Sequence, residues 1–176
     1  MIVEALARHV SSPVDLVLFG GGAMVLAYRS QRSTEDLDIL IDESQLRIYA
    51  DHGFGDVIEA TNRELEPRGF YIRHLWSPAQ EVLVQGWQER LTPIEAWWGN
   101  PLLQFRAISP IDMIASKLPR FDEIDREDIR FLITAGWVSK ENLKALASQL
   151  IITVAWEIEA ATIRMRADQL AQNGVC

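Results

Sequence analysis

The chain has 176 residues and a formal net charge of −8, with 48% hydrophobic and 24% charged residues. This length and composition are typical of one globular domain, or of one domain with a helical extension. The negative charge argues against a broad, non-specific nucleic-acid surface, because such surfaces bind phosphates through many lysines and arginines. A local basic groove is compatible with the composition.

The sequence also favours a cytoplasmic protein that does not associate with a membrane. Its first residues lack the basic stretch and apolar block of a secretory signal. No apolar run approaches the roughly 18 residues of a membrane span. The single cysteine, Cys176, cannot form an internal disulfide, which fits a reducing compartment.

Helices and strands are expected to follow one another in the first part of the chain. Apolar periodicity and turn residues predict, in chain order, a helix at 2–10, a strand at 15–19, a helix at 23–30, a strand at 35–41, helices over 43–66 broken at 52–55, and strands at 70–76, 81–84 and 103–108.

After residue 108 the pattern becomes helical. Ser109 followed by Pro110 is typical of a helix start, and a second start is expected at Ser139 after a break at 136–137. The apolar run 150–156 also fits the helical periodicity. We therefore predict an α+β fold, with a mixed sheet flanked by helices over 1–108 and a helical part over 109–176. The Trp97–Trp98 pair is expected in a core between the two parts or in an exposed interaction patch.

Two aspartates in an apolar strand are the first chemical signal. Asp36 and Asp38 are two residues apart, so they share one side of the expected strand, whereas Leu37 and Ile39 share the other. Adjacent carboxylates repel each other, and a divalent cation such as Mg²⁺ between them removes this cost. The alternative is a solvated strand face that carries two acids.

The glycines of the preceding turn strengthen the cation interpretation. Gly20, Gly21 and Gly22 end the previous apolar strand, and glycines at a strand-to-helix turn let backbone amides approach a phosphate. Other phosphate and cation motifs fail. The sequence has no Gly-Lys pair for a P-loop, and Val25 replaces the third glycine of the dinucleotide fingerprint. Leu40 and Ile41 do not fit an EF-hand loop.

The stretch Gly20-Gly21-…-Arg32-x-Thr34-x-Asp36-Leu37-Asp38 resembles the signature of the nucleotidyltransferase superfamily, which has the polymerase-beta-like fold. Its Arg-x-Thr-x-Asp-apolar-Asp form is similar to a minimal bacterial branch that includes type IV toxin, or abortive-infection, nucleotidyltransferases. The resemblance implies one or two Mg²⁺ ions on Asp36 and Asp38. It also implies a triphosphate held by the glycine amides and Arg32, and a Thr34 that contacts the nucleotide or shapes the turn.

A second stretch, SPIDMIASKLPRFDEIDREDIRFLI over 109–133, resembles a helical segment that follows the sheet in these families. The match places Lys117, Arg120, Asp125 and Asp128 in the site. Lys117 would reach a phosphate or handle a proton, and Asp125 or Asp128 would hold it or anchor the local fold. The alternatives are a Lys117 stem that snorkels, and a surface ion-pair cluster of the two aspartates with Arg126 and Arg130. Residues 86–90 resemble a further family segment without an assigned role.

The implied activity moves a nucleoside monophosphate from an NTP to a hydroxyl of RNA or protein, and it extends to a toxin with a partner antitoxin protein. Active members often have a third carboxylate on a later strand. Residues 70–76 contain no acid, and Glu81 is the nearest acid on an expected strand. A degenerate fold that binds a nucleotide or a partner protein without turnover is therefore a second hypothesis. A transferase for small molecules such as antibiotics is a third.

Overall fold

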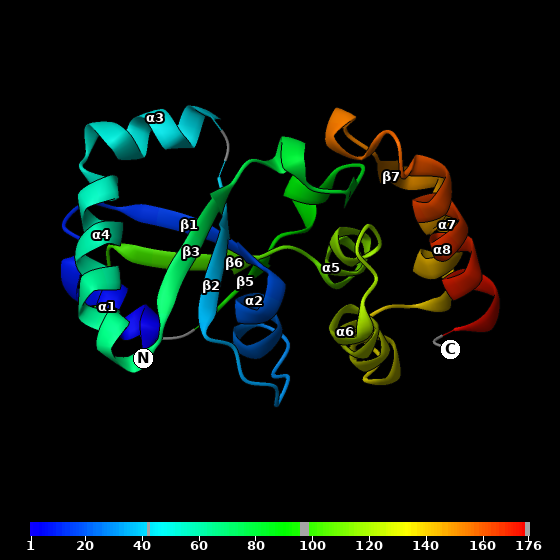
Figure 1. Cartoon of the computed structure of the whole chain (residues 1–176), viewed down its shortest axis with the longest axis horizontal. Helices are drawn as coiled ribbons and strands as arrows, with labels where there is room; N and C mark the ends of the chain where they lie inside the picture. Colours follow the sequence, from blue (N-terminus) through cyan, green and yellow to red (C-terminus); the bar gives the residue numbers. More distant parts are fainter. Residues whose placement is uncertain (42, 96–98, 175–176) are drawn as a thin grey trace. The chain divides into compact units, whose positions relative to one another are not determined.

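The computed structural model describes residues 1–41, 43–95 and 99–174. The chain forms two compact units, of which the first comprises Met1–Ser77 and Thr92–Ala107 and the second Pro78–Leu91 and Ile108–Cys176. The predicted α+β fold is confirmed by a mixed five-stranded sheet flanked by helices and by the helical C-terminal part of the chain (Figure 1). Division into domains at residue 108 stays a prediction. Trp97, Trp98 and Cys176 lie outside the described residues.

The first unit contains the whole five-stranded sheet. Its elements are α1 (Ile2–His9), β1 (Val14–Phe19), α2 (Gly20–Leu26), β2 (Asp36–Leu40), α3 (Glu43–Asp51), α4 (Phe54–Leu65), the 3-10 turn η1 (Glu66–Arg68), β3 (Tyr71–Trp76), β5 (Thr92–Pro93) and β6 (Leu103–Ala107). The strand order is β3-β2-β1-β6-β5. The β1 strand pairs antiparallel with β2 and parallel with β6, and β2 pairs parallel with β3. A central β1 explains why its sequence, VDLVLF, is almost entirely apolar.

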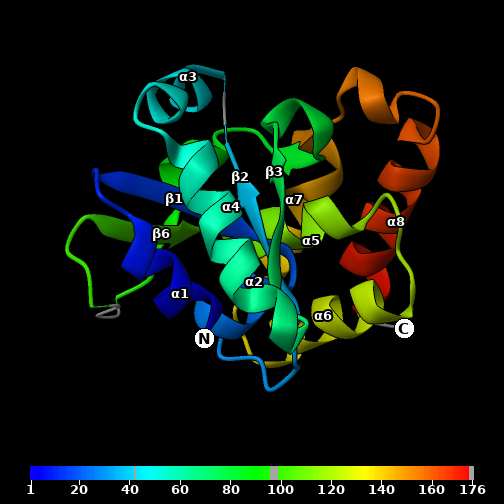
Figure 2. The same cartoon turned by 60° about the vertical axis from the view of Figure 1, so that its left-hand side comes forward.

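Helices α1 and α4 lie side by side in this unit (Figures 1 and 2). The apolar residues Val3, Leu6 and Val10 of the first helical segment follow helical spacing and are buried. At the surface Glu64 of α4 receives hydrogen bonds from Arg8 and pairs with His9. The Arg8 guanidinium, followed by His9, lowers the pKa of the Glu64 carboxyl. These contacts fix α1 against α4.

The second unit is mostly helical. Its elements are the 3-10 turn η2 (Pro78–Gln80), β4 (Leu83–Val84), the 3-10 turn η3 (Trp87–Arg90), α5 (Pro110–Lys117), α6 (Glu123–Thr134), α7 (Lys140–Gln149), β7 (Leu150–Ile151), the 3-10 turn η4 (Val154–Trp156) and α8 (Ala160–Asn173). The predicted helix starts are confirmed, because Ser109 and Ser139 each accept a hydrogen bond from the backbone amide three residues later. Among the described residues no helix is long and apolar enough to cross a membrane.

Three local predictions differ from the structure. Helix α2 begins at Gly20, so the three glycines are its first three residues and do not precede it. A second difference is that residues 118–122 separate α5 from α6, with Asp122 as the N-cap of α6. The run 150–156 is not one helix, because Leu150 and Ile151 form β7, which pairs antiparallel with β4. Pairing with a strand more than sixty residues earlier in the chain overrides the helical pattern there.

Candidate functional site

The glycine turn and the aspartate strand meet in the first unit. Phe19, the last residue of β1, pairs in register with Asp38, and Gly20 follows with a left-handed φ of +60°. A Cβ atom built on Gly20 would lie 2.6 Å from Oδ2 of Asp38. The Asp38 carboxylate therefore lies directly against the backbone of Gly20.

The other two glycines make equally close contacts. A Cβ on Gly21 would lie 2.7 Å from Oγ1 of Thr34, and one on Gly22 would lie 2.5 Å from Cδ1 of Leu37. The space beside all three glycines is thus occupied by side chains of β2 and of the segment that leads into it. The glycines have a packing role that the sequence interpretation did not include, because they let α2 approach β2. Triphosphate binding by their amides stays a prediction.

Thr34 also orients one of the two aspartates. Its hydroxyl lies 2.9 Å from Oδ1 of Asp36, to which it donates, and 3.2 Å from the Asp36 carbonyl oxygen. Asp36 and Asp38 are both half-buried, whereas Leu37 and Ile39 are fully buried. The predicted alternation along β2 is therefore confirmed. The two carboxylates share one face, and one of them is held by a hydroxyl.

Arg32 lies at the same corner. Its Nη2 atom would be 3.5 Å from a Cβ on Gly21, so its guanidinium lies beside the glycine turn. The structure thus brings together every residue predicted from the first motif, although the motif extends over nineteen positions of the chain. These residues are Gly20, Gly21, Gly22, Arg32, Thr34, Asp36 and Asp38.

The residues of the second motif form a buried ion-pair cluster in the second unit. Lys117, at the end of α5, places Nζ 3.2 Å from Oδ1 of Asp125 and 2.6 Å from Oδ2 of Asp128, both on α6. Lys117 is 3% exposed, and Asp125 and Asp128 are 0% and 4% exposed. A surface ion-pair cluster and a snorkelling Lys117 are therefore both wrong. The burial supports the anchoring role, in which these charges fix α5 to α6.

Arg120 completes this cluster from the loop between the two helices. Its guanidinium binds both oxygens of Asp125, at 3.0 and 3.2 Å, while 67% of its side chain is exposed. The hydrogen bonds that the Arg120 guanidinium donates to Asp125 are the main cause of the raised pKa of Arg120. With Lys117 and Arg120 against Asp125 and Asp128, the formal charges of the cluster sum to zero.

The segment 86–90 has a structural explanation that its sequence did not reveal. Arg90 donates to both oxygens of Asp112, at 3.1 and 3.3 Å, and to the carbonyl oxygens of Val84 and Gln85. Asp112 is fully buried and also accepts from Ser109 and from the amide of Val84. Arg90 and Asp112 thus hold β4 and η3 against the start of α5. The acid three residues after the Ser109 cap was the available sequence signal.

Residues 1–171 match the family described as a nucleotidyltransferase of unknown function (DUF6036). The chain belongs to this nucleotidyltransferase family. The match confirms the resemblance to the nucleotidyltransferase superfamily that the two motifs indicated. No curated protein and no solved structure was found to match the chain.

The acidic groups of this protein are compatible with a metal held by two protein carboxylates. Over the residues that the structure describes, no group of three or more His, Cys, Asp or Glu side chains could hold a metal ion. Glu81, the nearest acid predicted on a strand, lies outside a strand in the second unit, where its charge acts on Arg120. Asp36 and Asp38 lie on one face of β2, and their role as metal ligands stays a prediction.

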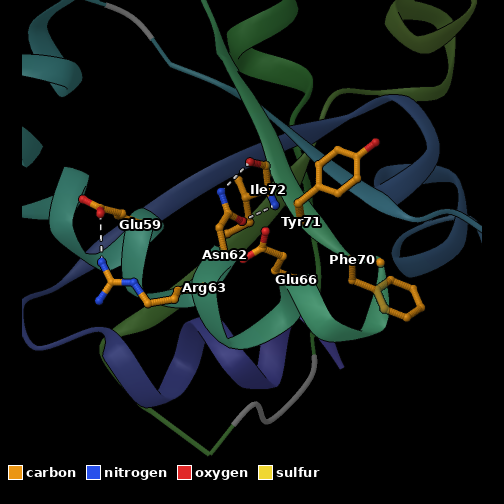
Figure 3. Close-up of a pocket in the computed structure, with 8 residues that line it drawn as sticks. Glu59, Asn62, Arg63, Glu66, Phe70, Tyr71 and Ile72 are labelled. Carbon is orange, nitrogen blue, oxygen red and sulfur yellow. Dashed lines mark hydrogen bonds and ion pairs between the residues drawn. The ribbon is translucent and has the colours of Figure 1, made fainter.

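The protein also has a surface hollow of about 530 Å³ in its first unit, beside α4 and the start of β3 (Figure 3). It is lined by Glu59, Asn62, Arg63, Glu66, Gly69, Phe70, Tyr71 and Ile72. Figure 3 shows Asn62 facing the backbone of Ile72, to which its amide makes two hydrogen bonds of 2.6 and 3.0 Å. None of the predicted site residues lines the hollow.

Proposed function

We propose that this protein is a Mg²⁺-dependent nucleotidyltransferase, which transfers a nucleoside monophosphate from an NTP to a hydroxyl of an RNA or protein acceptor. The observation that carries the proposal is the corner formed by Gly20, Thr34, Asp36 and Asp38. Family membership supports the same activity. A cytoplasmic location belongs to this proposal.

The two aspartates fit the preferences of Mg²⁺. In phosphate-transferring sites this ion is usually bound by one or two carboxylates, and substrate phosphates and water supply the other ligands. Asp36 and Asp38 are on one face of β2 and neither is fully buried, so both can meet a solvated ion. When bound there, Mg²⁺ supplies charge neutralisation for the triphosphate and the leaving group.

The transfer itself needs one bond to form and one to break. The acceptor hydroxyl oxygen attacks the α-phosphorus of the NTP and releases its proton to solvent. The bond from the α-phosphorus to the oxygen that bridges to the β-phosphate breaks, and pyrophosphate leaves. Positioning and charge stabilisation provide most of the catalysis in such reactions. Arg32, whose guanidinium lies at the glycine turn, is the chain's cation for the phosphates in this corner.

The proposal assigns different roles to the residues of the second motif, which are Lys117, Arg120, Asp125 and Asp128. The two carboxylates on Lys117 support an anchoring role, and proton handling by Lys117 is the alternative. Arg120 has the exposed side chain of the four, so it is the member that we propose for phosphate binding. Urea unfolding of Lys117→Met, described in the Discussion, separates the anchoring role of Lys117 from proton handling.

Thr34 is expected to act by orienting Asp36. Thr34→Val keeps the shape of the side chain but removes the hydroxyl that Asp36 accepts, so Mg²⁺ affinity is expected to fall by about 10–100-fold. Thr34→Ser is expected to restore it. Titration calorimetry with Mg²⁺ in the presence of a non-hydrolysable NTP measures this directly. Equal Mg²⁺ affinity in the valine variant and the wild type would remove the positioning role.

The activity is tested by incubating the purified protein with each α-labelled NTP, Mg²⁺, and total cellular RNA or protein. We expect label to appear in one acceptor class and pyrophosphate to be released in equal amount. The Asp36→Asn/Asp38→Asn variant, which keeps the size of both side chains, is expected to fold and to transfer no label. Full transfer by this variant would show that the metal assignment is wrong.

A second function is favoured because, among the described residues, no third acidic side chain joins Asp36 and Asp38 in a group that could hold a metal ion. In that case the fold binds a nucleotide or a partner protein without turnover, and the same incubation gives NTP binding without pyrophosphate release. If the protein transfers nucleotides, we propose that it acts as a toxin whose partner is an antitoxin protein. This role predicts that expression stops growth and that the Asp36→Asn/Asp38→Asn variant does not.

A further inference from the structure

The segment that joins α7 to α8 displays large apolar side chains to solvent. Ile151 is 42% exposed, Val154 is 88% exposed and Ile158 is 94% exposed. We call these three side chains, together with Glu157 and Glu159, the loop patch. Single exposed apolar residues are common on protein surfaces, but here three of them lie within eight residues of one connection.

The backbone that carries the loop patch is fixed at several points. Ile151 belongs to β7, which pairs with Leu83 of β4. The indole N–H of Trp156 donates to the carbonyl oxygen of Gln80 at 2.8 Å. The backbone N–H of Trp156 donates to the carbonyl oxygen of Thr153 at 2.9 Å. Figures 1 and 2 show this orange segment beside the start of α8. Val154 and Ile158 are therefore held outward by an ordered loop.

The loop patch is also acidic. Between Ala145 and Ile163 the sequence has two charged residues, Glu157 and Glu159, and no lysine or arginine. Both glutamates are exposed, and they flank Ile158 directly. An apolar side chain between two carboxylates is complementary to an apolar group flanked by cations.

This charge pattern decides between a second copy of the chain and a different partner. In a two-fold dimer the same surface meets itself, so a patch whose charged members are Glu157 and Glu159 would meet a second patch of the same negative charge. Each chain also carries a net charge of −8, which adds repulsion between copies. We infer that the loop patch is the docking surface for a different protein, one that presents apolar side chains flanked by lysine or arginine.

The test uses a defined probe, a fluorescein-labelled peptide of alternating isoleucine and lysine. Fluorescence anisotropy with the full chain gives its affinity. We expect Val154→Ser/Ile158→Ser and Glu157→Gln/Glu159→Gln each to weaken binding by about tenfold. The control Leu46→Ser/Ile124→Ser removes two apolar side chains of 44% and 56% exposure elsewhere, and it is expected to bind as the wild type does. A peptide with glutamate in place of lysine is expected not to bind.

Two results would overturn the inference. The first is equal peptide affinity for the wild type and Val154→Ser/Ile158→Ser, which would show that the peptide senses net charge alone. The second is a wild-type dimer in sedimentation velocity that becomes monomeric in Val154→Ser/Ile158→Ser, which would assign the surface to a second copy. The replaced side chains of the loop patch are exposed and belong to neither motif, so circular dichroism is expected to show unchanged folding.

Discussion

Replacing Lys117 by methionine is expected to lower the free energy of unfolding by about 3–5 kcal/mol. The substitution keeps most of the apolar stem but removes the ammonium that lies 3.2 Å from Asp125 and 2.6 Å from Asp128. Arg120 still pairs with Asp125, so the loss of the Lys117 ammonium affects the carboxylate of Asp128 more than that of Asp125. A buried carboxylate without a cation is strongly destabilising. Urea unfolding followed by circular dichroism measures the loss.

Lys144 on α7 provides the matched control. It is exposed, so Lys144→Met is expected to change the free energy of unfolding by less than about 0.5 kcal/mol. Combining Lys117→Met with Asp128→Leu removes both opposite charges, and part of the lost stability is expected to return. If Lys117→Met unfolds at the same urea concentration as the wild type but loses transfer, Lys117 serves the nucleotide and not the anchoring of α5 to α6.

Gly20→Ala is expected to lower the free energy of unfolding by about 1–2 kcal/mol. It is also expected to lower nucleotide transfer more than an alanine at any glycine outside the 20–22 turn. Gly20 has a φ of +60°, which an alanine adopts only with strain. Its new Cβ would also lie 2.6 Å from Oδ2 of Asp38, so the carboxylate has to move. Urea unfolding and the labelled-NTP assay measure the two effects separately.

Gly55→Ala is the control for this change. Gly55 lies in α4, and a Cβ there would meet no atom within 4 Å. Alanine in a helix is more stable than glycine, so this variant is expected to gain about 0.5 kcal/mol and to keep wild-type transfer. A Gly20→Ala variant with wild-type stability and activity would contradict the close contact with Asp38.

Local sequence rules predicted much of the fold and the first part of the candidate site. Ser109 and Ser139 were recognised as helix caps because a cap depends on residues within one turn. The alternation of Asp36 and Asp38 with Leu37 follows from strand geometry alone. The convergence of Gly20, Thr34 and Asp38 was implied by the family motif.

Features that depend on distant segments were not predictable in this way. The β7 strand forms because Leu150 and Ile151 meet β4, and a helical period in the sequence does not contain that information. The partnership of Arg90 with Asp112 joins residues that are 22 positions apart in the sequence, and neither residue identifies the other as its partner. The glycine contacts were also missed, since a sequence shows that a side chain is absent but not which neighbour fills its place.

The amide of Asn62 has a consequence for how copies of this protein meet. Strand β3 is at one end of the sheet, and its Ile72 turns its N–H and C=O groups to Asn62 and not to another strand. An unpaired outer strand is a template on which foreign strands add and fibrils grow. Here the Asn62 side chain already pairs with the N–H and C=O groups of Ile72, so an added strand would find no backbone partner at this residue.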